Sequence, residues 1–303
     1  MAAGALPAVI DPAGLDVLQA EPARWLPVVA GLAQRFTDAA CVPADTSTVL
    51  VGLAGKVVVK VYAPFLQDHF AFERAALSHL HGRLSLPTPQ LLADGTEHGW
   101  PWLAMTRLPG EPLLRVWPGL AEARRLAVLR RIGQVAAELH ALPVGPLQAV
   151  APAWPDFLAR QRAGCVRRQQ RTGLPASLLA QLPRFLDGPV PEGPAVVLTG
   201  EFTPFNLLVA DDGSLRGMID FGDGLVGPRQ YDWLGPMCFF AEGRAERIDA
   251  FFAGYGTAPP RTGREALLRL LLLHRYSCLP AQLNLPDWEG APDFATLAAR
   301  WCP

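Results

Sequence analysis

The chain has 303 residues, half of them hydrophobic, and is long enough to bury one large core or the cores of two lobes. A net charge of −1 argues against a nucleic-acid-binding protein that neutralises phosphates. The five cysteines are scattered and contain no Cys-x-x-Cys pair, which indicates neither a disulfide framework nor a zinc site. We therefore expect a cytoplasmic globular protein with no signal peptide and no membrane span.

A helix is expected first, over 21–40, because apolar residues recur there at helical spacing. β-rich runs at 48–53 and 57–62, joined by a glycine-containing turn, predict a hairpin. Lys60 lies inside the second run and Lys56 in the turn, and these two are the only lysines among 27 lysine and arginine residues. A lysine inside an apolar strand is therefore a candidate functional residue. The alternative is a side chain whose head group reaches solvent along an apolar stem.

The next predicted helix covers 67–81 and carries Glu73. Two further strands are expected at 91–94 and 102–106, with a turn at 95–99. Together with the hairpin, these strands predict a small lobe rich in β-structure.

A boundary between lobes is predicted at 105–112, where proline and glycine interrupt the pattern. We therefore expect an N-terminal lobe, 1–106, and a C-terminal lobe, 107–303. Helices are predicted in the second lobe at 121–142, 157–172, 177–186, 248–255 and 264–278, and a tail that packs back at 288–301. A mostly helical lobe after a mostly β lobe defines an α+β fold class.

Several polar residues of the second lobe are interpreted as structural. His140 lies in the last turn of its helix, where a histidine usually caps carbonyl groups. Asp232 precedes a helix and is predicted to be its N-cap. The helix at 157–172 carries five arginines, for which a solvated face is the simpler explanation and a surface for an anionic substrate or partner is the alternative.

A hairpin is predicted near residue 212. Apolar runs at 207–210 and 215–219 flank the tetrapeptide Asp-Asp-Gly-Ser at 211–214, and Asp-Gly is a strong signal for a two-residue turn. That turn pairs Asp211 with Ser214 in an antiparallel register.

Counting outward from this turn pairs Asn206 with Ile219, so that Asn206 and Asp220 lie side by side at one end. Glu201 lies five residues before Asn206. Carboxylate and amide oxygens on adjacent strand ends suit Mg²⁺ far better than a soft metal. The sequence therefore predicts a magnesium site here.

This stretch resembles the catalytic and metal-binding segment of the aminoglycoside phosphotransferase and choline kinase-like family. The usual pattern there is H-G-D-x-x-x-x-N, then a hairpin and I-D-F/W-x-D. In this chain it reads Thr199-Gly200-Glu201, then Asn206, then Ile219-Asp220-Phe221-Gly222-Asp223. Thr199 stands in place of the histidine, and Glu201 in place of the aspartate that orients or deprotonates the acceptor hydroxyl.

The resemblance extends over about 45–280 and implies a two-lobed, protein-kinase-like fold. It implies an enzyme that transfers a phosphoryl group from ATP or GTP to a hydroxyl group of a small molecule, such as an antibiotic-like natural product or a metabolite. Asn206 and Asp220 would hold Mg²⁺, Asp223 would be a further metal-site carboxylate, and Glu201 would be the catalytic residue.

Nucleotide contacts are also implied by the resemblance. Lys60 would hold the α- and β-phosphates and Glu73 would orient the lysine. A glycine-rich phosphate loop is not evident. Segment 43–48 takes that place, and any phosphate contacts there would come from its backbone amides and hydroxyls, with Ser47 and Thr48 as candidates. The adenine-binding hinge would include Met105 and Arg107.

Two alternatives to a small-molecule kinase stay open. One is a nucleotide- or ligand-binding pseudokinase, because both departures from the pattern fall in the catalytic loop. The other is a kinase that acts on a protein, and the oligomeric state is equally open. Residues 151–303 hold 16 acidic residues and 15 arginines, so a neutral or anionic acceptor is expected rather than a polycationic aminoglycoside.

Overall fold

The computed structural model describes residues 6–45 and 47–303. The chain divides into two units. The first contains the residues up to Gly110 together with Arg216–Gly224, and the second contains Glu111–Leu215 and Leu225–Pro303. The segment that carries Asp220 therefore belongs to the first unit, although the residues around it in sequence belong to the second. A single division of the chain, as between 1–106 and 107–303, does not describe these units.

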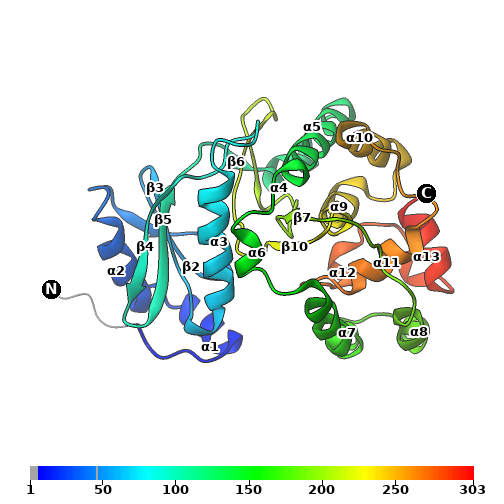
Figure 1. The fold of residues 1–303 in the computed structure, drawn as a ribbon, viewed down its shortest axis with the longest axis horizontal. Helices are drawn as coiled ribbons and strands as arrows, with labels where there is room; N and C mark the ends of the chain where they lie inside the picture. The colour runs from blue at the N-terminus through cyan, green and yellow to red at the C-terminus, as the bar shows by residue number, and fades with distance from the viewer. Residues whose placement is uncertain (1–5, 46) are drawn as a thin grey trace. The chain divides into compact units, whose positions relative to one another are not determined.

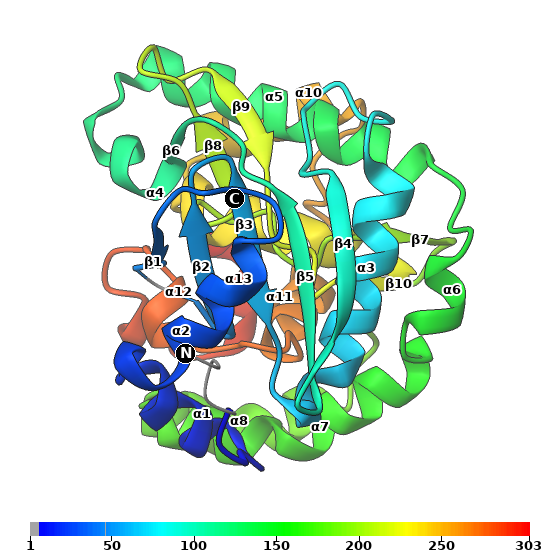
Figure 2. The same cartoon turned by 90° about the vertical axis from the view of Figure 1, so that its left-hand side faces the viewer.

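The first unit is an antiparallel sheet with helices. In chain order its elements are α1 (Pro12–Gln19), α2 (Pro22–Ala33), β1 (Cys41–Pro43), β2 (Leu50–Ala54), β3 (Val57–Val61), η1 (Pro64–Leu66), α3 (Gln67–Leu80), β4 (Leu91–Glu97) and β5 (Trp100–Thr106). The strand order is β1-β2-β3-β5-β4, and all neighbours are antiparallel (Figure 2).

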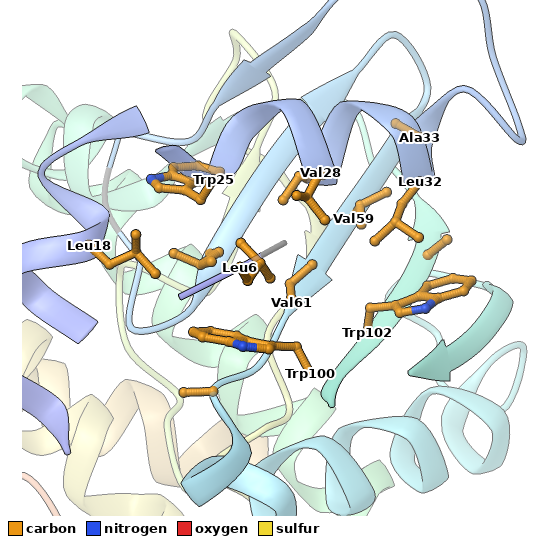
Figure 3. Close-up of a cluster of buried hydrophobic side chains, with 14 of the residues drawn as sticks. Leu6, Leu18, Trp25, Val28, Leu32, Ala33, Val59, Val61, Trp100 and Trp102 are labelled. Atoms are coloured by element: carbon orange, nitrogen blue, oxygen red, sulfur yellow. The ribbon is translucent and has the colours of Figure 1, made fainter. Parts of the chain in front are cut away.

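The two faces of this sheet differ because side chains alternate along a strand. Val59 and Val61 of β3 point into a hydrophobic cluster with Val28 and Leu32 of α2 (Figure 3). Lys60, between the two valines, therefore points to the opposite face, where its ammonium group reaches α3. The period of two residues thus buries α2 against one face and directs Lys60 to the other.

Some boundaries differ from those expected. The first predicted helix ends at Ala33 rather than near residue 40, because the chain turns and Phe36 packs back against the core cluster. The predicted turn at 95–99 is shorter, because β4 continues to Glu97. His98 and Gly99 make the turn, both with positive φ, as a tight hairpin requires.

The second unit is mostly helical. Its elements are β6 (Glu111–Pro112), α4 (Leu113–Val116), η2 (Trp117–Gly119), α5 (Glu122–Ala141), α6 (Leu147–Val150), α7 (Trp154–Arg171), α8 (Ala176–Leu186), β7 (Ala195–Leu198), β8 (Leu207–Val209), β10 (Leu225–Pro228), α9 (Gln230–Pro236), the π-helical turn η3 (Met237–Ala241), α10 (Ala245–Tyr255), α11 (Arg264–Leu272), α12 (Leu279–Gln282), η4 (Trp288–Gly290) and α13 (Phe294–Trp301). β9 (Leu215–Met218) begins in this unit and ends in the first. An antiparallel sheet unit and a helical unit confirm the predicted α+β class.

Helices α5 and α10 lie side by side (Figure 1). Their backbones approach at two glycines: a Cβ added at Gly133 would lie 2.1 Å from the carbonyl oxygen of Phe251, and one added at Gly254 would lie 1.9 Å from that of Arg130. No side chain fits at these crossing points, so glycine is required there by space. Within the described residues, no helix is both long and apolar enough to cross a membrane.

Candidate active site

Lys60 is held by two carboxylates within the first unit. Its Nζ lies 2.7 and 3.0 Å from the two oxygens of Glu73 in α3, and 2.8 Å from Oδ1 of Asp220. The Lys60 and Glu73 side chains are buried, whereas that of Asp220 is 38% exposed. The structure thus brings together three of the residues that the sequence predicted to act as a group.

Burial alone would lower the pKa of Lys60, but the charges of Asp220 and Glu73 outweigh it and raise the pKa. The lysine is therefore charged at neutral pH. Burial raises the pKa of Glu73, and Lys60 opposes that change. One positive and two negative charges leave the group with an excess carboxylate, which a bound cation can neutralise.

Tyr62 is a member of this group that the sequence interpretation missed. Its hydroxyl donates a hydrogen bond to Oε2 of Glu73, and its side chain is buried. Burial, followed by the charge of Glu73, raises the pKa of Tyr62, so the hydroxyl keeps its proton. The signal was present in the sequence, because Tyr62 lies two residues after Lys60 and an extended chain places both on one face.

Asp220 has the left-handed backbone conformation, with φ of 64°, which aspartate tolerates better than most residues. Lys60 occupies Oδ1, and no hydrogen bond to Oδ2 is found in the part of the chain that the structure describes. Asp223 lies nearby in sequence, with Oδ1 3.2 Å from Nδ1 of His69. A partly exposed carboxylate oxygen is a hard ligand that suits Mg²⁺.

In the second unit, Glu201 and Asn206 contact each other. The Asn206 side-chain amide donates to Oε2 of Glu201 over 3.1 Å. This use of the nitrogen leaves the amide oxygen as the possible metal ligand. The Asp220 carboxylate of the first unit and the Asn206 amide oxygen of the second are each hard oxygen donors of the kind that Mg²⁺ prefers. Among the described residues, no group of three or more His, Cys, Asp and Glu side chains could hold a metal.

The predicted two-residue turn between β8 and β9 is wrong. Gly213 N donates to Ala210 O over 2.8 Å, and Ala210 N donates to Ser214 O over 2.9 Å, so the loop has three residues. Gly213 takes the left-handed conformation that closes such a loop, and Asp212 accepts from Ser214 N. Ala210, rather than Asp211, is opposite Ser214.

This correction shifts the register at the turn by one residue. The predicted pairing of Asn206 with Ile219 was counted outward from a two-residue turn, so this pairing is wrong as well. Asn206 belongs to the second unit and Asp220 to the first.

A buried carboxylate holds the start of the loop that contains Glu201. Asp232 accepts from Thr199 N over 3.0 Å and from Gly200 N over 2.9 Å, and also from the Thr199 hydroxyl. Asp232 is therefore not the N-cap that was predicted, because α9 begins two residues earlier, at Gln230. Gly200, with φ of 76°, makes the turn that a residue with a Cβ would strain.

The prediction that His140 caps carbonyl groups is also wrong. Its Nε2 contacts Asp232 over 3.1 Å, and its Nδ1 contacts the Tyr255 hydroxyl over 2.8 Å. His140 is thus a buried partner of the carboxylate that holds the loop. Tertiary contacts decide its role, since the carbonyl groups at the helix end were the only partners visible from the sequence.

The remaining predicted nucleotide residues are separate from the Lys60 group in their contacts. Ser47 and Thr48 are exposed, and the Ser47 hydroxyl accepts from Val49 N; Thr46 lies outside the described residues. Met105 is buried and pairs with Val58, so it lies on the same sheet face as Lys60. Arg107 is exposed, and its backbone N donates to Lys56 O.

The arginine side chains of helix α7 are only partly exposed to solvent. Arg168 donates to the carbonyl oxygen of Leu272 over 3.1 Å, at the end of α11, and Arg162 donates to that of Leu186, at the end of α8. Two of its arginines thus satisfy helix C-terminal carbonyl groups. Arg160, Arg167 and Arg171 are exposed.

A model of the phosphotransferase enzyme family matches residues 43–267. No curated protein sequence matches the chain significantly.

Solved structures of aminoglycoside phosphotransferases share the fold. The GDP complex of aminoglycoside 2'-phosphotransferase-IIIa has a TM-score of 0.68 at 15% identity, over 93% of this chain and 98% of that one. The GDP and kanamycin complex of APH(2")-IIia has a TM-score of 0.66 at 18% identity, over 82% of this chain and 86% of that one. APH(3'')-Id from Streptomyces rimosus, with ADP and streptomycin, has a TM-score of 0.62 at 20% identity, over 82% and 98%.

Proposed function

Because this chain belongs to the phosphotransferase enzyme family, we propose that it transfers the γ-phosphoryl group of ATP or GTP to a hydroxyl group of a small molecule. The observation that carries the proposal is the contact of Lys60 with both Glu73 and Asp220. Kinase-like phosphoryl transfer needs a lysine oriented by a helix glutamate and an aspartate at the metal. The nucleotide complexes of the similar structures support the same donor class.

Each residue has a role that follows from its chemistry. Lys60 binds phosphate oxygens, and Glu73 keeps its ammonium group in place. Asp220 and Asn206 would hold Mg²⁺, with Asp223 as a further carboxylate, and the ion when bound would neutralise phosphate charge. Glu201 orients the acceptor hydroxyl and takes its proton.

Glutamate at position 201 is compatible with this role. Phosphoryl transfer passes through a loose transition state, so positioning and electrostatics matter more than strong base catalysis. Asn206 fixes one oxygen of Glu201 by a hydrogen bond, which limits the freedom that the additional methylene gives. We therefore favour an enzyme over a pseudokinase.

Nucleotide binding is tested with Lys60→Met. A ligand that binds only the folded protein raises the melting temperature by mass action. MgATP or MgGTP should raise it for the parent, and the shift should fall sharply in the variant, because the phosphates lose their cation. Lys56→Met is the matched control, since Lys56 is the other lysine and is exposed in the β2–β3 turn. Equal shifts in all three proteins would refute the assignment of Lys60.

Turnover is tested with Glu201→Gln. The amide cannot accept the hydroxyl proton, so turnover should fall by a factor on the order of 10² or more while nucleotide binding is kept. Glu201→Asp should retain part of the rate. Nucleotide binding without turnover in the parent, against a broad panel of hydroxyl compounds, would instead support the pseudokinase.

A further inference from the structure

A pocket of about 180 Å³ lies within the second unit, beside Glu201. Its lining includes three aromatic rings, from Phe205, Phe239 and Tyr276. The rings of Phe205 and Phe239 meet edge to face, with centroids 5.9 Å apart. Phe205 is 49% exposed and Tyr276 39% exposed, so both side chains keep accessible surface that a ligand in the pocket could cover.

The carboxylate of Glu201 is the charged group that this lining contributes. His274 also lines the pocket, and both of its ring nitrogens contact backbone groups: Nδ1 accepts from the backbone N of Tyr276, and Nε2 lies 3.0 Å from the carbonyl oxygen of Gly200. Burial raises the pKa of the Cys238 thiol, which therefore stays protonated. A polycation would meet one carboxylate here, and that carboxylate already accepts from Asn206.

A buried hydroxyl in the lining lacks a partner. Thr203 is 5% exposed, and its Oγ1 makes no hydrogen bond to any residue in the described parts of the chain. An unsatisfied buried hydroxyl costs free energy, so a partner from outside the protein is expected, and a ligand in the pocket could supply it. Thr203 follows Glu201 by two residues, and Thr203 N donates to Glu201 O over 2.8 Å, so both belong to one tight turn.

The helix geometry next to the pocket is irregular for an identifiable reason. Pro236 lies at the end of α9 and has no N–H to continue the regular ladder, and the π-helical turn η3 follows it. This turn carries Cys238 and Phe239 into the lining. π-Helical turns occur frequently at functional sites.

We propose, on the basis of the phosphotransferase function above, that the acceptor is an uncharged alcohol or phenol whose hydroxyl is carried by a single ring-sized apolar group. The volume supports this class, because an apolar cavity of about 150 Å³ binds benzene. The aromatic rings contact the apolar body, Thr203 hydrogen-bonds a polar group of the acceptor, and Glu201 receives the reacting hydroxyl.

The transfer needs no reactant other than the nucleotide and the acceptor. The acceptor oxygen forms a bond to the γ-phosphorus, and the bond from that phosphorus to the β,γ-bridging oxygen breaks. Nucleoside diphosphate leaves, and the hydroxyl proton passes to Glu201 and then to water.

The test uses the full chain with benzyl alcohol and 4-(hydroxymethyl)phenol as probes and kanamycin as the polycationic comparison. Phosphate ester formation with MgATP and MgGTP is followed by ³¹P NMR, and probe binding without nucleotide by titration NMR. We expect kcat/KM for at least one ring alcohol to exceed that for kanamycin by 10-fold or more. Thr203→Val should weaken the binding of 4-(hydroxymethyl)phenol, the probe with a second hydroxyl group, by about 3- to 10-fold, the loss of one hydrogen bond.

Two further variants make the result specific. Thr262→Val makes the same change at an exposed residue and should leave probe binding unchanged. Phe239→Trp places a larger ring in the lining and should abolish probe binding while the nucleotide-induced melting shift is kept. Preference for kanamycin, or equal probe binding by the parent, Thr203→Val and Phe239→Trp proteins, would overturn the inference.

The two proposals fail in different ways. Kanamycin phosphorylation that depends on Lys60, without binding of the ring alcohols, would overturn the acceptor class and keep the phosphotransferase. Binding of ring alcohols that depends on Thr203, without any nucleotide binding, would overturn the phosphotransferase and keep the pocket's ligand class.

Discussion

At the scale of single residues, the main feature of the first unit is the charged pair of Lys60 and Glu73, whose side chains are both buried. Glu73 is fully buried, and it is tolerated there because Lys60, the Tyr62 hydroxyl and the backbone N of Phe221 all donate to its oxygens. Buried charges are stable only when their hydrogen bonds are satisfied. Each donor therefore helps to fix the direction in which Lys60 points.

Tyr62→Phe tests this contribution. The ring contact with Phe70, at 5.6 Å between centroids, is retained by phenylalanine, so the variant removes only the hydroxyl. We expect a loss of about 1–3 kcal/mol in the free energy of unfolding, measured by urea denaturation, because a buried carboxylate loses a donor. Nucleotide affinity, measured by calorimetry, should fall as Glu73 becomes less well placed.

A double-mutant cycle shows whether the hydroxyl acts through Glu73. In a Glu73→Gln background the hydroxyl no longer meets a carboxylate, so Tyr62→Phe should cost much less there than in the parent. Equal costs in both backgrounds would show that Tyr62 stabilises the fold by another contact.

At the scale of elements, the α5–α10 pair shows how close packing depends on residue size. Gly133→Ala should destabilise the protein by about 1–3 kcal/mol or more in the free energy of unfolding, because the new methyl group meets the Phe251 carbonyl oxygen and both helices must move apart. Chemical denaturation followed by circular dichroism measures the change.

Gly31→Ala in α2 is the matched control. Among the described residues, and apart from the adjacent backbone of its own helix, nothing lies within 4 Å of a Cβ added at Gly31, so alanine fits and has the better helix propensity. This variant should be more stable than the parent by about 0.5–1 kcal/mol. Destabilisation of equal size in both variants would contradict the role of backbone contact at Gly133.

A buried arginine joins the starts of α5 and α10 and creates a pH dependence. Arg247 donates two hydrogen bonds of 2.8 Å to Glu122 and pairs with Glu242 over 2.7 Å. The hydrogen bond from Arg247 lowers the pKa of Glu122 from its ordinary 4.5 to about 2. Since the folded-state pKa is depressed, the stabilisation is complete above pH 4.5 and is lost as the pH falls through 2.

Glu122→Gln should therefore lower the melting temperature at pH 7 and flatten its dependence on pH between 4.5 and 2. Because the Glu122 side chain is 39% exposed to solvent, we expect the substitution to lower the free energy of unfolding at pH 7 by only about 1 kcal/mol. Glu246→Gln, at an exposed position of α10, should leave the melting curve near that of the parent. A parent-like acid profile for Glu122→Gln would exclude this ion pair as the cause.

At the scale of the whole molecule, the first unit is completed by a segment from far along the chain. Met218 N donates to Pro87 O over 3.0 Å, and the Phe72 ring occupies the space where a Cβ of Gly224 would lie. Asp220 in the same segment supplies one of the two carboxylates of Lys60. The 216–224 segment is thus part of this unit's core and of its charged group.

We therefore expect the isolated fragment 1–110 to lack a cooperative thermal transition. It would leave the Phe72 ring uncovered and Lys60 without Asp220. Circular dichroism melting compares it with a fragment in which 216–224 is joined to Gly110 by a flexible linker, and that fragment should recover a transition. A cooperative transition of the short fragment at the temperature of the longer one would show that 216–224 is dispensable.

Several features of this protein follow from the sequence alone, because they depend on local periodicity and spacing. The β2–β3 hairpin, the helix that carries Glu73 and the direction of Lys60 away from the valine cluster all result from side-chain alternation or helical period. The motif at 199–223 indicated the family, because the types and the spacing of its polar residues can be seen in the sequence without knowledge of the structure. Tyr62 was also predictable in principle, by the same period of two.

Other features were decided only by tertiary structure. Asp-Asp-Gly-Ser is compatible with loops of two or three residues, and the hydrogen bonds that Gly213 and Ser214 make decide between them. The roles of His140 and Asp232 depend on partners 92 residues apart in sequence, which no local pattern specifies. The pocket beside Glu201 likewise takes its lining from segments far apart in the chain, because tertiary packing, rather than the sequence of any one segment, brings Phe205, Phe239 and Tyr276 together.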